Sequence, residues 1–135
     1  MTAVALHSAA RPLIGLVFVV GGWSTLQKPE PRIELAEPVL ETAEDVIPEP
    51  VRPSRRTLVQ ANAVAQLAAG LALPFRRLTR PAAAVLAVTL APATLGGHRF
   101  WEAENEEERE QQLHHFLKNL AILGGLLLEL DSGRR

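Results

Sequence analysis

Long stretches without charge constrain this chain more than any other feature. Three windows lack Asp, Glu, Lys and Arg altogether, and a fourth is broken only by Lys118; they are residues 12–26, 57–75, 81–98 and 113–128. A bilayer core of ~30 Å requires about 20 helical residues. If Arg11 extends its charged end to the interface, the first window also reaches that length. The windows therefore predict an all-α, four-helix transmembrane bundle with spans at about 8–26, 57–75, 81–98 and 113–130.

Two other interpretations of the apolar windows are weaker. A soluble four-helix bundle needs a polar face on every helix, yet residues 82–93 contain only Thr89 as a clearly polar residue, and 13–20 contain none. A chain of 135 residues cannot enclose four such helices. A cleaved signal peptide at 1–26 would need a strongly basic start, and three further candidate spans follow it.

The orientation follows from the short connection between the second and third spans. Three arginines within residues 76–80 mark the cytoplasmic side, so a four-span chain would have both termini in the cytoplasm. Trp23 and Trp101 would then lie at the outer interface, as an aromatic belt requires. The arginines at 52–56 fall on the outer side, against the rule. We expect a multi-pass membrane protein.

The loop between the first two spans, residues 27–56, has its own helical pattern. Apolar residues recur there at intervals of three and four between flanking prolines, namely Ile33, Ala36, Leu40, Ala43 and Ile47. This spacing predicts an amphipathic helix at about 32–47 in the first extracytoplasmic loop. We expect it to cover the outer end of the bundle, with docking of a partner as the alternative. The whole chain, 1–135, forms one domain.

Polar residues within the predicted spans are informative because they are costly there. A lysine at the centre of a membrane helix costs ~2.5–3.5 kcal/mol on insertion scales, so Lys118 should face the bundle interior or water. Helical phase places several other polar side chains on the same inner surface. The sequence predicts a polar pocket beneath the loop helix, formed by Asn62, Gln66, His98, His114, Lys118 and Asn119.

Two uses of this pocket remain open. A hydrogen-bond network that holds the bundle together is the commonest reason for such residues, and a quinone head group would suit a hydrogen-bond donor beside an imidazole. No metal is expected, because the adjacent His114 and His115 cannot both point at an ion that His98 also reaches. No catalytic triad, paired carboxylates or phosphate loop is visible. The chain has no cysteine, and its net charge of −1 argues against nucleic acid.

Several short segments resemble the DoxX family in its actinobacterial form. The most specific are Gly-His-Arg-Phe-Trp at 97–101 and His-Phe-Leu-Lys-Asn at 115–119, and weaker likeness extends over about 11–130. The resemblance implies a four-helix bacterial membrane protein. It also implies a link to quinone-dependent oxidoreductases or to redox and detoxifying enzymes. The family has no agreed catalytic residues that could be transferred to this chain.

These observations lead to one expectation and two alternatives about function. We expect an inner-membrane subunit or anchor of a redox-related complex, with the lipid bilayer and soluble redox or detoxifying enzymes as partners. The first alternative is a quinone-binding oxidoreductase subunit in its own right, with quinone as the cofactor. The second is a carrier of small molecules. The sequence leaves both enzymatic activity and oligomerisation open.

Overall fold

The computed structural model describes residues 2–97 and 99–132. All the regular secondary structure of these residues is helical. No strand occurs in the part of the chain that is described, so the all-α prediction is confirmed. The elements in chain order are α1 (Ala3–Gln27), α2 (Glu30–Leu35), α3 (Glu37–Val46), the 3-10 turn η1 (Glu49–Val51), α4 (Arg55–Ala72), α5 (Thr79–Gly97), the 3-10 turn η2 (Phe100–Glu102) and α6 (Glu106–Ser132).

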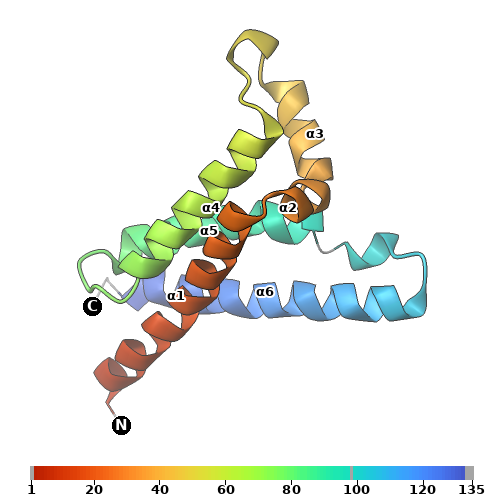
Figure 1. Ribbon diagram of the computed structural model, residues 1–135. Coiled ribbons are helices and arrows are strands. Elements are labelled where there is room, and N and C mark those ends of the chain that lie inside the picture. The colour runs from red at the N-terminus through yellow and green to blue at the C-terminus, as the bar shows by residue number, and fades with distance from the viewer. Residues whose placement is uncertain (1, 98, 133–135) are drawn as a thin grey trace.

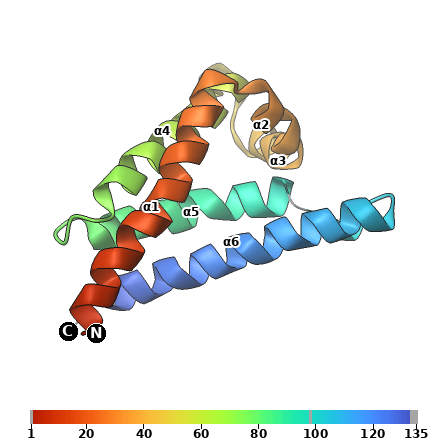
Figure 2. The same cartoon turned by 60° about the horizontal axis from the view of Figure 1, so that its bottom comes forward.

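The four long helices form two pairs that open like a wedge. Helix α1 packs along α4, and α5 packs along α6, with α4 and α5 joining the pairs (Figure 1). Helices α1 and α6 meet beside the two chain ends and then diverge (Figure 2). The short helices α2 and α3 lie at the wide end of the wedge. We call α2 and α3, residues 30–46, the lid.

The predicted single helix over 32–47 is two helices in the structure. The chain bends at Ala36, whose φ of −88° and ψ of 0° end α2, and α3 begins directly afterwards. Pro38 explains the break, because it has no N–H to donate to the carbonyl four residues earlier and its ring disfavours a continuous helix. Each of the two helices instead has a proline in its first turn, where the missing donor costs nothing.

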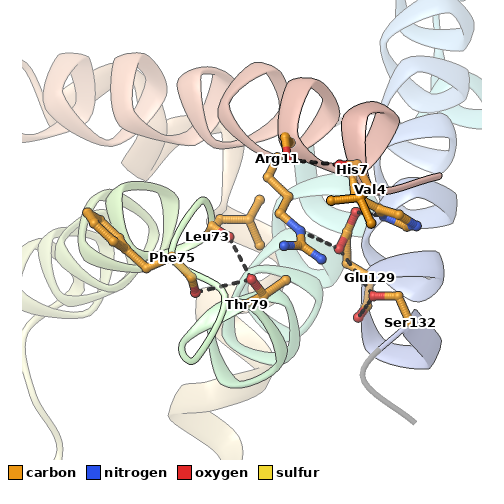
Figure 3. A network of polar contacts seen from close by, with 9 residues as sticks. Val4, His7, Arg11, Leu73, Phe75, Thr79, Glu129 and Ser132 are labelled. Atoms are coloured by element: carbon orange, nitrogen blue, oxygen red, sulfur yellow. Dashed lines mark hydrogen bonds and ion pairs between the residues drawn. The ribbon is translucent and has the colours of Figure 1, made fainter. Parts of the chain in front are cut away.

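The narrow end of the wedge holds the apolar core. Leu73, Leu86 and Leu126 have no exposed surface there, and Phe18 packs against them. A buried hydroxyl closes the turn between α4 and α5, since Thr79 donates to the carbonyls of Leu73 and Phe75 at 3.0 and 3.2 Å (Figure 3). The turn therefore holds its shape from inside the core.

Within the part of the chain that the structure describes, two segments are long and apolar enough to cross a membrane, Ala3–Gln27 and Thr79–Glu102. The other two long helices carry more polar residues. Helix α4 starts with Arg55 and Arg56, and the first turn of α6 holds three glutamates. Each predicted span overlaps one long helix, but a four-span topology remains a prediction for α4 and α6.

Candidate functional site, a cavity beneath the lid

A cavity of about 300 Å³ lies at the wide end of the wedge, between the lid and the four long helices. Most of its wall is apolar and includes Phe18 of α1, Leu40 of the lid and Leu90 of α5. Pocket sizes of this order suit small molecules or the head group of a larger one. The lid supplies one wall, because Leu35, Val39 and Ala43 also line the cavity.

Four of the six predicted pocket residues line this cavity. Asn62 and Gln66 reach it from α4, and Lys118 and Asn119 reach it from α6. His114 is not among the lining residues and is exposed. It lies one turn before Lys118, towards the start of α6. His98 lies outside the described residues. Whether the set forms a functional site remains a prediction.

Two of the polar residues already use their hydrogen bonds inside the protein. The buried Asn119 amide donates to the Thr94 hydroxyl at 3.0 Å, and that hydroxyl donates to the Leu90 carbonyl at 2.9 Å. Asn119 thus joins α6 to α5 beside the cavity. Gln66 donates over a long 3.5 Å to the Thr89 carbonyl, which links α4 to α5. Part of the predicted pocket therefore serves helix packing.

Arginines at the start of α4 hold the lid in place. Arg55 donates to both carboxylate oxygens of Glu44, at 2.6 and 2.9 Å. Arg56 donates to Glu30 at 2.7 Å. Arg52 donates to the carbonyls of Glu44 and Ile47 at the end of α3. These contacts give the arginines at 52–56 a structural role, and so explain why they occur on the side where the positive-inside rule does not expect them.

Acid should loosen the lid through Glu44. Hydrogen bonds from Arg55 hold the pKa of the Glu44 carboxyl below its ordinary value of 4.5; partial burial opposes this, and the charges of Arg55 and Arg52 assist it. A carboxyl whose pKa is lowered by folding stabilises the lid fully above its unfolded pKa. The contribution is lost as the pH falls through the lower, folded value. We expect amide exchange in α3 to accelerate below about pH 4.5.

The matched variants for this prediction are Glu44→Gln and Glu34→Gln. The first should show faster exchange in α3 already at neutral pH and little further change in acid. Glu34 is exposed and has no ion pair among the described residues, so Glu34→Gln should behave like the unmodified protein. Equal pH profiles for Glu44→Gln and the unmodified chain would contradict the assignment.

The sequence reasoning missed a charged cluster at the narrow end, which Figure 3 shows. The Glu129 carboxylate, 3% exposed, accepts from Arg11 Nε at 2.8 Å and lies 2.7 Å from His7 Nδ1. Ser132 donates to the same carboxylate at 3.3 Å. Arg11 was expected to extend to the interface and instead pairs with Glu129. The signal that could have indicated this pair is the opposite charge of Arg11 and Glu129, since a four-span topology would put the start of the first predicted span and the end of the last on the same side.

An aromatic cluster lies at the opposite end of α6. The rings of Phe100, Trp101 and Phe116 contact one another edge to face, with centroids 5.1 to 6.0 Å apart. Such contacts are favourable beyond the area they bury. The cluster attaches η2 to the first half of α6, and it gives this end of the molecule an amphipathic aromatic surface.

Comparison with known proteins identifies one family. The model of the family described as DoxX matches residues 6–99, which is more than half of the chain and covers α1 to the end of α5. No curated protein and no solved structure matches the sequence. The matched region contains the lid and the part of the cavity that α1, α4 and α5 contribute.

Proposed function

The chain belongs to the DoxX family, and on that premise we propose that it is a four-span plasma-membrane subunit of a redox-related complex whose cavity binds a quinone head group. Its membership makes it an integral membrane protein. The cavity carries the proposal, because it combines an apolar wall with amide and ammonium donors at the junction of all four long helices. A quinone offers the matching chemistry, with two carbonyl acceptors on an apolar ring.

The surface of the long helices supports four spans rather than two. Large apolar side chains are exposed on each of them, for example Leu13 on α1 (67%), Leu71 on α4 (57%), Val88 on α5 (72%) and Leu128 on α6 (69%). In water, apolar surface on every side of a small protein would drive aggregation. In lipid the same surface is solvated by the acyl chains. The polar residues that reduce the average hydropathy of α4 and α6 include four that line the cavity, namely Asn62, Gln66, Lys118 and Asn119.

The shape of the molecule supports a topology with both termini in the cytoplasm. The start of α1, the end of α6 and the arginine-rich turn between α4 and α5 lie on one side (Figures 1 and 2). The lid and the aromatic cluster lie towards the other. This arrangement agrees with the positive-inside rule for residues 76–80 and with an outer aromatic belt.

Cysteine labelling would test the topology. The natural chain has no cysteine, so single cysteines at Val51 and Leu78, both exposed, can be labelled without background. We expect an impermeant thiol reagent to label Val51→Cys in intact cells and Leu78→Cys only after lysis. The reverse pattern would overturn the orientation, and labelling of both in intact cells would overturn the four-span topology.

Quinone binding would be tested on protein purified in lipid nanodiscs. We expect organic extraction to recover bound quinone, and expect Asn62→Leu to reduce it about two- to tenfold, because a lost hydrogen bond to a carbonyl contributes ~0.5–1.5 kcal/mol. Gln60→Leu, on the same helix but outside the cavity lining, is the matched control. Equal quinone content in the two variants would contradict the site, and absence of quinone from the natural protein would contradict the proposal.

A further inference from the structure

Two cationic side chains line the cavity without any counter-ion. Arg32 reaches it from the lid and Lys118 from α6, and no aspartate or glutamate is among the lining residues. Within residues 2–97 and 99–132, neither the guanidinium nor the ammonium group has a hydrogen-bond or ion-pair acceptor. The cavity therefore carries uncompensated positive charge.

Nearby arginines show that acceptors are available at this end of the molecule and are used. Arg55 pairs with Glu44, Arg56 with Glu30, and Arg99 with Glu102 at 2.9 Å. Arg32 and Lys118 differ from them in facing the cavity. A positive charge beside an apolar wall in a membrane is weakly screened, so its attraction for an anion is larger than in water. Both residues are exposed, and neither charge has an acceptor in the described part of the chain, so both are available to an anionic ligand.

We infer that this cavity accepts an amphiphile with an acidic head group, a carboxylate or a phosphate on an apolar chain. The inference rests on the proposed function only in that the cavity is a ligand site. An acidic amphiphile is a second class of ligand beside the neutral quinone, because a quinone would leave both positive charges without a counter-ion. Lys118 and Arg32 bind the acidic group, and the apolar side chains of α1, α4 and the lid contact the chain. A free fatty acid and an anionic phospholipid share this chemistry.

Native mass spectrometry of the full chain from zwitterionic micelles would measure the selectivity. A long-chain fatty acid should bind at least tenfold more tightly than the fatty alcohol of the same length. Lys118→Met should weaken binding of the acid about tenfold to a hundredfold, the range for a charge-assisted hydrogen bond, and leave the alcohol unchanged. Lys118→Arg should restore binding of the acid, which shows that any loss in Lys118→Met comes from charge and not from misfolding.

The location of the ligand can be read from the two lysines of the chain, Lys28 and Lys118. The fatty acid should protect Lys118, but not the exposed Lys28, from an amine-reactive reagent, and Lys28→Met should bind it normally. Protection in nanodiscs of anionic phospholipid, without added acid, would support the phospholipid as the source.

Two outcomes separate this inference from the proposed function. If the alcohol or a quinone protects Lys118 as well as the acid does, the acidic selectivity is overturned while the ligand site remains. If neither the acid, the phospholipid, the alcohol nor a quinone protects Lys118, both the inference and the proposed ligand site are overturned.

Discussion

Replacing Glu129 by alanine should lower the free energy of unfolding by about 3–5 kcal/mol, the usual cost of removing one partner from a buried ion pair. Glu129 is 3% exposed and receives Arg11, which is 16% exposed, and His7. These residues lie 118 and 122 positions away in the chain, and they join the start of α1 to the end of α6. The alanine variant would leave the Arg11 guanidinium buried without an acceptor. Equilibrium unfolding in mixed detergent micelles would measure the loss.

Two further variants separate this cause from a general weakening of α6. Asp131 is exposed and has no ion pair among the described residues, so Asp131→Ala should change stability by less than ~0.5 kcal/mol. The double variant Arg11→Leu/Glu129→Leu removes both charges and should lose less than Glu129→Ala, because no unpaired charge remains. A Glu129→Ala protein as stable as Asp131→Ala would show that the cluster does not connect the helices.

Replacing Gly15 by leucine should separate α1 from α4. A Cβ built on Gly15 collides with the Gly70 carbonyl oxygen, and one built on Gly70 comes within 2.8 Å of the Gly15 carbonyl oxygen. Both obstacles are backbone atoms, which cannot rotate away. Overpacking costs ~1–3 kcal/mol even where side chains can adjust, so we expect a loss of at least about 3 kcal/mol. The same unfolding measurement would detect it.

Gly124→Leu is the matched control for this prediction. A Cβ on Gly124 meets nothing within 4 Å, and the substitution gains the same helix propensity as Gly15→Leu. The difference between the two variants therefore reports the close approach alone. Similar stabilities would mean that α1 and α4 are not held at the distance that the structure shows.

Local residue patterns predicted the helices well but missed the break in the lid. Absence of charge over 57–75 and 81–98 corresponds to α4 and α5, because a helix that satisfies its own backbone is the simplest structure for such segments. The spacing of the apolar residues Ile33, Ala36 and Leu40 predicted a helix. That spacing takes no account of Pro38, which cannot lie in the interior of a continuous helix. Reading Pro38 as a first-turn residue would have predicted α3.

The candidate site was predictable only in part. Helical phase shows which residues share one face of a helix, but it does not show which part of that face lines the cavity. Asn62, Gln66, Lys118 and Asn119 line one cavity, yet His114, on the same face as Lys118, is outside it. Lys118 was expected to face the bundle interior or water, and it lines the cavity while remaining exposed.

The sequence by itself determined the family, the helical class and the position of the long helices, because charge-free windows and short motifs are local properties of the chain. The tertiary structure alone decided that Arg11 and His7 meet Glu129, that α1 and α6 diverge from that point, and that Arg32 joins Lys118 in one cavity. These contacts join residues far apart in the chain, and they depend on which helices pack together. No local pattern carries that information.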